Sequence, residues 1–166
     1  KIRSLTQADF VIAAMSGNFV QRGEPALIDK YARTEMALSC GADLVIELPA
    51  LWATASAELF ASAGVALMRK CGCVDTICFG AETDNLSLLK EVASLLVSEP
   101  EDYKEVLSSC LKEGMSYPAA RSQAVCSYLK KANQQIPADE LACLLNEPNN
   151  ILAIKYLKPI QAKNAA

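Results

Sequence analysis

The sequence predicts an α/β fold in which a parallel sheet is flanked by helices and followed by a helical C-terminal part. Two observations predict it. The chain is 52% hydrophobic but only 6% aromatic, a composition that suits helices packed on a sheet better than a β-sandwich. Short apolar runs also alternate with helical patterns in the first half of the chain. That alternation predicts right-handed crossovers between parallel strands, with ligands bound beyond the carboxyl ends of those strands.

Three short apolar runs are the predicted strands. They span residues 9–15, 44–48 and 74–79. Each run is apolar on successive positions, which is typical of strands buried on both faces of a parallel sheet. Turn signals follow the runs at Ser16, Pro49 and Gly80. The loops that begin there are therefore the expected place for functional residues.

Helical patterns lie between and after these runs. The pattern over residues 29–38 can be capped by Asp29 and closes near Gly41, and a second pattern covers residues 56–69. Beyond Gly80 only helices are predicted, over residues 86–97, 103–112, 118–130, 139–145 and 151–157. A chain of 166 residues most often forms one domain. We expect residues 1–85 to form its core and residues 86–166 to form a helical extension of the same domain.

Residue counts exclude several classes of function. The chain contains no histidine, which excludes serine-triad chemistry, histidine-ligated zinc and imidazole acid–base catalysis within this sequence. Its net charge of −3 creates no overall attraction to nucleic acid, so such a contact needs a local basic patch or further parts of the protein. The sequence has no run of about 18 apolar residues and no signal-peptide pattern. We expect a cytoplasmic protein without a membrane partner.

The chain contains seven cysteines, an odd number. They are Cys40, Cys71, Cys73, Cys78, Cys110, Cys126 and Cys143. Most lie in apolar segments, so we expect buried free thiols that form no disulfides. Cys71 and Cys73 have the wrong spacing for a zinc knuckle or a redox pair. We therefore expect no structural metal.

The loop after the first predicted strand combines glycines with polar and cationic side chains. Ser16 and Gly17 open it, and Gln21 and Arg22 follow. Glycine lets backbone N–H groups approach a ligand, and an arginine can hold an anion with two parallel hydrogen bonds. The alternative is an ordinary surface loop.

Two basic residues follow that loop. Lys30 and Arg33 lie three positions apart near the start of the first predicted helix, and so on one helix face. They could form a cationic rim for phosphate or RNA. The alternative is a solvated helix face.

Gly80 closes the third predicted strand, where a nucleotide-binding α/β protein places a glycine against a base, ribose or phosphate. The alternative is a tight turn in which glycine only supplies a permissive backbone. Glu82 and Asp84 follow it. These acids could bind magnesium, but they are explained more simply as favourable partners of a helix dipole.

Two asparagines follow Pro148 at a predicted helix start. Asn149 or Asn150 can serve as the N-cap, which explains one of them. An N-cap role leaves the other asparagine without an explanation. Because a carboxamide both donates and accepts hydrogen bonds, it can pair with the edge of adenine.

Several long segments together resemble the bacterial tRNA(Met) cytidine acetate ligase family, a branch of the HIGH-motif nucleotidyltransferase superfamily. The segments are MSGNFVQRGEPALIDKYARTEMAL, GADLVIELP, CFGAE, SYPAAR and PNNILAIKYLK. The resemblance implies a Rossmann-like nucleotide-binding core. It further implies an enzyme that activates acetate with ATP as acetyl-adenylate and transfers the acetyl group to the wobble cytidine of elongator tRNA(Met).

The resemblance also suggests site residues and cofactors. Gly80, Asn149 and Asn150 are expected to line the ATP site, and the loop that contains Ser16, Gly17, Gln21 and Arg22 is expected to face the acid substrate or phosphates. Magnesium is expected to screen the ATP phosphates in the complete enzyme. The family's HxGH histidines do not occur before Lys1. We therefore expect this chain to be part of a longer protein whose preceding segment supplies those catalytic residues and the first strand.

Two alternatives remain open at this point. One is another nucleotidyltransferase of the same superfamily, and the other is a non-catalytic fragment that binds nucleotide or RNA. The lack of histidine favours the second alternative if the chain is complete.

Overall fold

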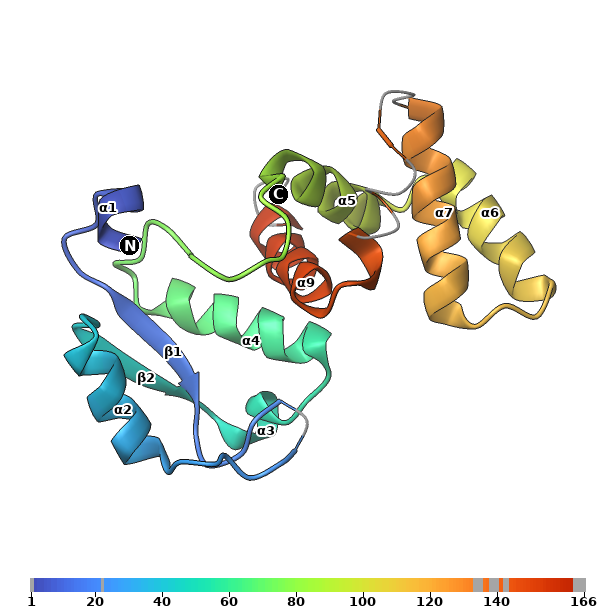
Figure 1. Cartoon of the computed structure of the whole chain (residues 1–166). Helices are drawn as coiled ribbons and strands as arrows, with labels where there is room; N and C mark the ends of the chain where they lie inside the picture. The colour runs from blue at the N-terminus through green and yellow to red at the C-terminus, as the bar shows by residue number, and fades with distance from the viewer. Residues whose placement is uncertain (1, 22, 133–135, 138–140, 142–143, 163–166) are drawn as a thin grey trace. The chain divides into compact units, whose positions relative to one another are not determined.

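The computed structural model describes residues 2–21, 23–132, 136–137, 141 and 144–162. It divides the chain into two compact units, Lys1–Phe79 and Gly80–Ala166. The first unit contains the sheet and the second is helical (Figure 1). The expectation of one domain with a boundary after residue 85 stays a prediction.

The sheet of the first unit consists of two parallel strands, β1 (Ile12–Ser16) and β2 (Leu44–Leu48). Ile12 pairs with Leu44 at one end, and Ser16 pairs with Leu48 at the other. Helix α2 (Lys30–Ser39) connects the strands, so the predicted order of strand, helix and parallel strand is confirmed. The carboxyl ends of β1 and β2 therefore lie side by side.

The helices of the first unit begin and end near their predicted positions. Asp29 caps α2, because its carboxylate accepts hydrogen bonds from the backbone N–H of Tyr31 at 2.9 Å and of Ala32 at 3.1 Å. Ser56 caps α4 (Ala57–Lys70), and α4 contacts both strands. Two short helices, α1 (Ile2–Thr6) and α3 (Ala50–Ala53), were not predicted.

The prediction of a third strand over residues 74–79 is wrong. The structure assigns no strand to this segment, in which Val74, Ile77 and Phe79 are half-buried and Cys78 is exposed. A strand requires a neighbour for its backbone N–H and C=O groups. Within the described part of the chain this segment pairs with neither β1 nor β2. An apolar run does not by itself distinguish a paired strand from an extended segment that buries only some of its side chains.

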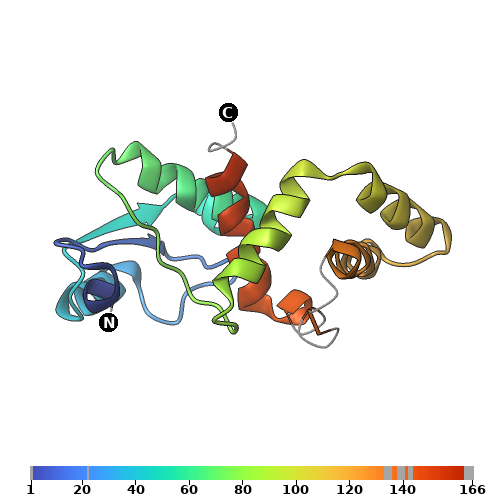
Figure 2. The same ribbon diagram turned by 90° about the horizontal axis from the view of Figure 1, so that it is seen from above.

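The second unit contains two helix pairs. Helix α5 (Leu86–Ser98) packs against α9 (Pro148–Ala162), as Figures 1 and 2 both show. Helix α6 (Glu101–Lys112) packs against α7 (Tyr117–Ala132). The four helices confirm four of the five that were predicted after Gly80. The fifth, over residues 139–145, falls largely outside the described residues.

Apolar side chains hold the first helix pair together. The buried ones on α5 and α9 are Leu88, Leu89, Val92, Ala93, Leu95, Leu96, Ala153, Ile154 and Leu157. Gln161 adds a polar contact, since its Nε2 donates to the backbone carbonyl of Lys90 at 3.0 Å. This contact joins the last turn of α9 to α5.

The expectation that the cysteines are buried is wrong for Cys40, Cys73 and Cys78, which are exposed. Cys40 ends α2, a helix without a buried residue. Cys73 directly precedes the segment over residues 74–79, and Cys78 lies within it. Cys110 is buried as expected. Burial also raises the pKa of the half-buried Cys126 thiol, against the opposing effect of Lys130. Cys143 lies outside the described residues.

Within the described residues, no helix is both long and apolar enough to cross a bilayer.

Candidate functional site

The site in the second unit joins the segment after Gly80 to the first turn of α9. Glu82 Oε1 accepts hydrogen bonds from the backbone N–H of Asn149 at 3.2 Å and from Asn149 Nδ2 at 2.7 Å. Glu82 Oε2 accepts from the backbone N–H of Asn150 at 2.8 Å. In return, Asn150 Oδ1 accepts from the backbone N–H of Glu82 at 2.9 Å and of Thr83 at 3.0 Å. We call these four residues the clamp.

The clamp satisfies backbone groups that a helix leaves without partners. The first N–H groups of a helix have no acceptor within it and carry a partial positive charge. Pro148 occupies the first position of α9 and has no N–H to satisfy. The next two N–H groups, of Asn149 and Asn150, both donate to the Glu82 carboxylate. A charged acceptor makes these hydrogen bonds stronger than bonds between neutral groups.

The structure differs from two predictions for this site. Glu82 does interact with a helix dipole, but with that of α9 rather than that of α5, the next helix along the chain. Neither Asn149 nor Asn150 precedes its helix as an N-cap, because both lie within the first turn of α9. The hydrogen bonds that join these segments span 67 and 68 positions in sequence, so local spacing could not indicate them.

The two asparagines have different surroundings. Asn150 is 1% exposed, and its carboxamide oxygen already accepts two backbone N–H groups. Asn149 is exposed, and its carboxamide nitrogen donates to Glu82. Asn149 is therefore the asparagine whose side chain can reach a ligand, whereas Asn150 holds the backbone of residues 82–83 in place.

Gly80 lies two residues before the clamp and faces open space. A Cβ atom added there would meet no described atom within 4 Å, and its φ angle is outside the left-handed region that favours glycine. Neither the backbone conformation nor a neighbouring side chain therefore requires glycine at this position. The structure therefore does not support the alternative explanation, in which Gly80 is needed only for a tight turn.

Glu82 and Asp84 are the acidic residues that follow Gly80. Both carboxylate oxygens of Glu82 accept hydrogen bonds within the clamp, and Asp84 is exposed. Among the residues that the structure describes, no group of three or more His, Cys, Asp or Glu side chains could hold a metal ion.

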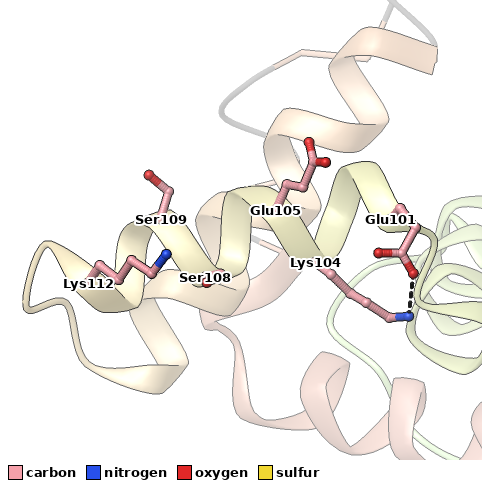
Figure 3. A pocket seen from close by; sticks show the side chains of 6 residues that line it. All are labelled: Glu101, Lys104, Glu105, Ser108, Ser109 and Lys112. Atoms are coloured by element: carbon pink, nitrogen blue, oxygen red, sulfur yellow. Dashed lines mark hydrogen bonds and ion pairs between the residues drawn. The ribbon is translucent and has the colours of Figure 1, made fainter.

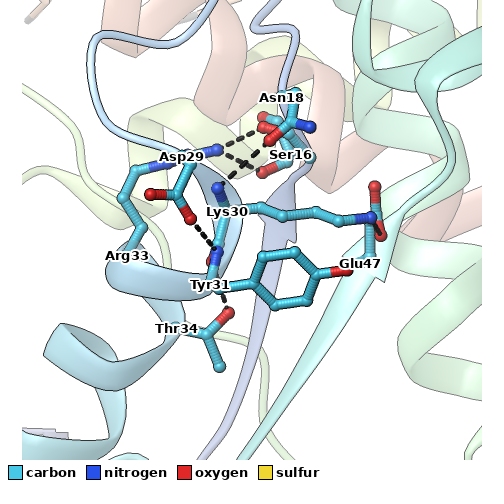
Figure 4. Close-up of polar contacts among 9 residues, drawn as sticks. Ser16, Asn18, Asp29, Lys30, Tyr31, Arg33, Thr34 and Glu47 are labelled. Carbon is cyan, nitrogen blue, oxygen red and sulfur yellow. Dashed lines mark hydrogen bonds and ion pairs between the residues drawn. The ribbon is translucent and has the colours of Figure 1, made fainter.

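The loop of the first unit lies at the carboxyl end of β1 (Figure 4). Arg33 Nη2 donates to the backbone carbonyl of Ser16 at 2.9 Å and also to that of Gly17. Arg33 Nε donates to the carbonyl of Ile28 at 3.1 Å. The guanidinium group thus joins the end of the strand to the start of α2.

Lys30 and Glu47 form an ion pair beside that loop. Lys30 Nζ lies 2.7 Å from Glu47 Oε2, and the Lys30 backbone N–H donates to Asn18 Oδ1 at 3.1 Å. The hydrogen bond to Glu47 raises the pKa of Lys30, against the opposing effect of burial. An added Cβ at Gly17 would overlap Glu47 Oε1 and lie 3.0 Å from Glu47 Cδ. Glycine at position 17 therefore leaves room for the Glu47 side chain.

The structure brings Ser16, Gly17, Lys30 and Arg33 together but gives the two cations contacts within the protein. The prediction that Lys30 and Arg33 contact RNA stays a prediction. Gln21 lies in the turn between Val20 and Gly23, where the Gly23 N–H donates to the Val20 carbonyl at 2.8 Å. Arg22 lies outside the described residues.

Sequence reasoning missed Asn18 and Glu47, which hold this loop. Glu47 carried a usable signal, because it is the one charged residue within the apolar run over residues 44–48. A charge in such a run needs a partner, and Lys30 supplies it.

A shallow hollow lies elsewhere, along the exposed surface of α6 (Figure 3). Its lining residues are Glu101, Lys104, Glu105, Ser108, Ser109 and Lys112. All of them belong to one helix, so the hollow brings no distant parts of the chain together. We do not regard it as a functional site.

Comparison with known proteins gives matches over nearly the whole chain. A model of the HIGH Nucleotidyl Transferase family matches residues 1–166. The tRNA(Met) cytidine acetate ligase of Clostridium perfringens is 49% identical over 158 residues, which are 95% of this chain. The enzyme of the same name from Acetivibrio thermocellus is 50% identical over 159 residues, or 96% of this chain.

Solved structures give the same result. Thermotoga maritima TmcAL bound with alpha-thio ATP matches 98% of this chain with a TM-score of 0.91 and 39% sequence identity. Its apo form matches the same share with a TM-score of 0.89. The chain spans 39% of the C. perfringens relative and 39% of the ATP-analogue-bound chain. It belongs to the HIGH nucleotidyl transferase family, in its tRNA(Met) cytidine acetate ligase branch.

Proposed function

We propose that this chain is the nucleotide-binding part of an ATP-dependent tRNA(Met) cytidine acetate ligase. The observation that carries the proposal is the match over 98% of the chain, at 39% identity, to a TmcAL structure bound with alpha-thio ATP. The names of the relatives favour this function over another nucleotidyltransferase of the superfamily and over a non-catalytic fragment.

The proposed reaction has two steps. An acetate oxygen attacks the α-phosphorus of ATP, the bond to the β-phosphate oxygen breaks, and acetyl-adenylate and pyrophosphate form. The amine of the cytidine then attacks the acetyl carbonyl, loses a proton, and releases AMP. Charge that develops on the phosphates needs donors already in place, each worth roughly 3 kcal/mol of barrier.

Within this chain, Gly80 and Asn149 are the residues that we place at ATP. Open space at Gly80 supports a close approach of the ligand to the backbone. The exposed Asn149 carboxamide offers an oxygen that can accept a hydrogen bond from the adenine amine. Asn150 supports the site indirectly, because its side chain accepts hydrogen bonds from the backbone N–H groups of Glu82 and Thr83.

Magnesium is part of the proposal for the whole enzyme, since a divalent cation would screen the ATP phosphates. The Glu82 carboxylate does not fit this role, because both of its oxygens accept hydrogen bonds from the start of α9. We therefore assign no magnesium ligand within this chain.

For the other substrates, we place acetate or the phosphates near the loop of Ser16 and Gly17, and we keep Lys30 and Arg33 as candidate contacts of tRNA(Met). Arg33 would first have to release the carbonyls of Ser16 and Gly17 before it could bind a phosphate through the same N–H groups. A cytoplasmic location accords with tRNA as the substrate.

The test uses the full-length protein that contains this chain, with ATP, magnesium, labelled acetate and a tRNA(Met) transcript. We expect labelled acetyl groups on the tRNA and one AMP for each transfer. A transcript in which the wobble cytidine is replaced by uridine is the control and should accept no label. Equal labelling of the two transcripts, or labelling without ATP, would contradict the proposed function.

A further inference from the structure

We infer that Glu82 is a positioning residue for ATP binding, which acts by orienting the Asn149 carboxamide and the first turn of α9. The inference rests on the proposed function, because it takes Asn149 as the residue that contacts ATP. This role differs from metal binding and from an interaction with the dipole of α5, the next helix along the chain.

The first argument is the number and direction of the contacts that Glu82 makes. One carboxylate accepts three N–H groups, at 2.7, 2.8 and 3.2 Å, from two adjacent residues. One of the three is the side-chain Nδ2 of Asn149. Because Nδ2 donates to Glu82, the carboxamide cannot rotate freely, and its oxygen keeps one direction.

The second argument is that each segment accepts hydrogen bonds from the other: Glu82 accepts them from the start of α9, and Asn150 accepts them from residues 82–83. Asn150 Oδ1 accepts the backbone N–H groups of Glu82 and Thr83 and is buried. The chain two residues after Gly80 is therefore held at a fixed distance from the start of α9. A ligand that contacts both Gly80 and Asn149 meets a site that is already formed, which reduces the entropy lost on binding.

The third argument is chemical. Glutamine has nearly the same shape as glutamate, but it replaces one acceptor oxygen with an NH₂ donor. In a Glu82→Gln variant, an NH₂ group would face N–H groups at the start of α9. The charge-assisted bonds would be lost, and the Asn149 side chain would become free to turn.

The experiment measures the affinity of the full-length protein for ATP by calorimetry in a double-mutant cycle of Glu82→Gln and Asn149→Ala. We expect Glu82→Gln to raise the Kd about tenfold, equivalent to about 1.4 kcal/mol. Because Glu82 acts through Asn149, the double variant should bind ATP as weakly as Asn149→Ala alone. The KM for ATP should rise while the KM for acetate stays unchanged.

Two further variants distinguish a positioning role of Glu82 from a general loss of folded structure. Glu101→Gln removes a carboxylate that pairs with Lys104 on the exposed surface of α6, and it should leave the Kd unchanged. Glu82→Asp keeps the charge but is shorter, so it should retain part of the affinity and provide a second measurement if Glu82→Gln unfolds. Thermal unfolding of each variant, compared with wild type, identifies such a case.

Separate results would overturn this inference and the proposed function. If wild type and Asn149→Ala differ in ATP affinity but both Glu82 variants bind ATP as wild type does, the positioning role is wrong and the proposed function stands. Additive effects in the cycle would also overturn the positioning role. If the wild-type protein does not bind ATP, the proposed function itself fails.

Discussion

At the scale of single residues, the two glycines after Ser16 and Phe79 show how different the reasons for a glycine can be. Gly17 makes room for a protein side chain, since Glu47 occupies the space beside it. Gly80 faces space that no described atom of the protein fills. The first glycine is explained by packing within the chain, whereas no described contact explains the second, which we propose lies at ATP.

Gly17→Ala should displace the Glu47 carboxylate and break its ion pair with Lys30. Because the obstructing atoms belong to the end of a flexible, partly exposed side chain, the free energy of unfolding should fall by no more than about 1 kcal/mol. Chemical denaturation measures this change. The same substitution in a Glu47→Ala background should cost less, and an equal cost in both backgrounds would contradict the explanation.

Gly80→Val should abolish detectable ATP binding to the full-length protein while changing the free energy of unfolding by less than about 0.5 kcal/mol. The reason is that the added methyl groups enter space that only a ligand would use. Calorimetry and denaturation measure the two quantities. Gly80→Ala, a smaller addition, should give an intermediate affinity. A Gly80→Val protein that binds ATP normally would remove Gly80 from the site.

At the scale of elements, α2 and α9 are capped in two different ways. Asp29 caps α2 from the adjacent position in sequence, so the local pattern was sufficient to predict it. Glu82 caps α9 from a distant segment, so inspection of residues around Pro148 alone indicated the wrong partner. Local rules thus predicted where α2 and α9 lie, but they could not predict which residue caps the start of α9.

Asp29→Ala should destabilise the first unit by about 1 kcal/mol, because the N–H groups of Tyr31 and Ala32 lose their acceptor. Asp29→Ser, which can still accept these hydrogen bonds, is the matched variant and should retain most of the stability. Urea unfolding gives both values. Equal destabilisation by serine and alanine would mean that Asp29 does not act as a cap.

Tyr103 on α6 provides a prediction for alkaline pH. Burial raises its pKa from the ordinary value of about 10 to about 12 in the folded protein. Folding therefore favours the protonated phenol, and this contribution is complete below pH 10 and is lost as the pH rises from about 10 to about 12. Tyr103→Phe should lose less stability over this range than wild type. An equal loss of stability in Tyr103→Phe and wild type would contradict this prediction.

The third predicted strand shows where the sequence pattern fails at the scale of elements. The run over residues 74–79 meets the same criteria as the two runs that do form strands. A strand forms only where a neighbouring strand can hydrogen-bond with its backbone, and a short apolar sequence does not reveal whether such a neighbour exists. Residues 44–48 satisfy the requirement because β1 lies beside them in register.

At the scale of the whole molecule, the chain contains two compact units, and each contains some of the residues that the sequence marked as candidates. The first holds the loop around Arg33, and the second holds Gly80 and the clamp. The sequence indicated Gly80, Asn149 and the loop as candidates, mostly through long matching segments in the right order. It did not indicate the hydrogen bonds of Glu82 and Glu47, because these join positions that lie far apart in sequence.

The measurement that tests the account most directly is the acetate-dependent exchange of labelled pyrophosphate into ATP by the full-length protein. This exchange reports formation of acetyl-adenylate alone, without tRNA. We predict exchange that requires acetate and magnesium in the wild type and is lost in Gly80→Val. Exchange that proceeds equally without acetate, or that persists at the wild-type rate in Gly80→Val, would contradict the claim that this chain holds ATP at Gly80 for the activation of acetate.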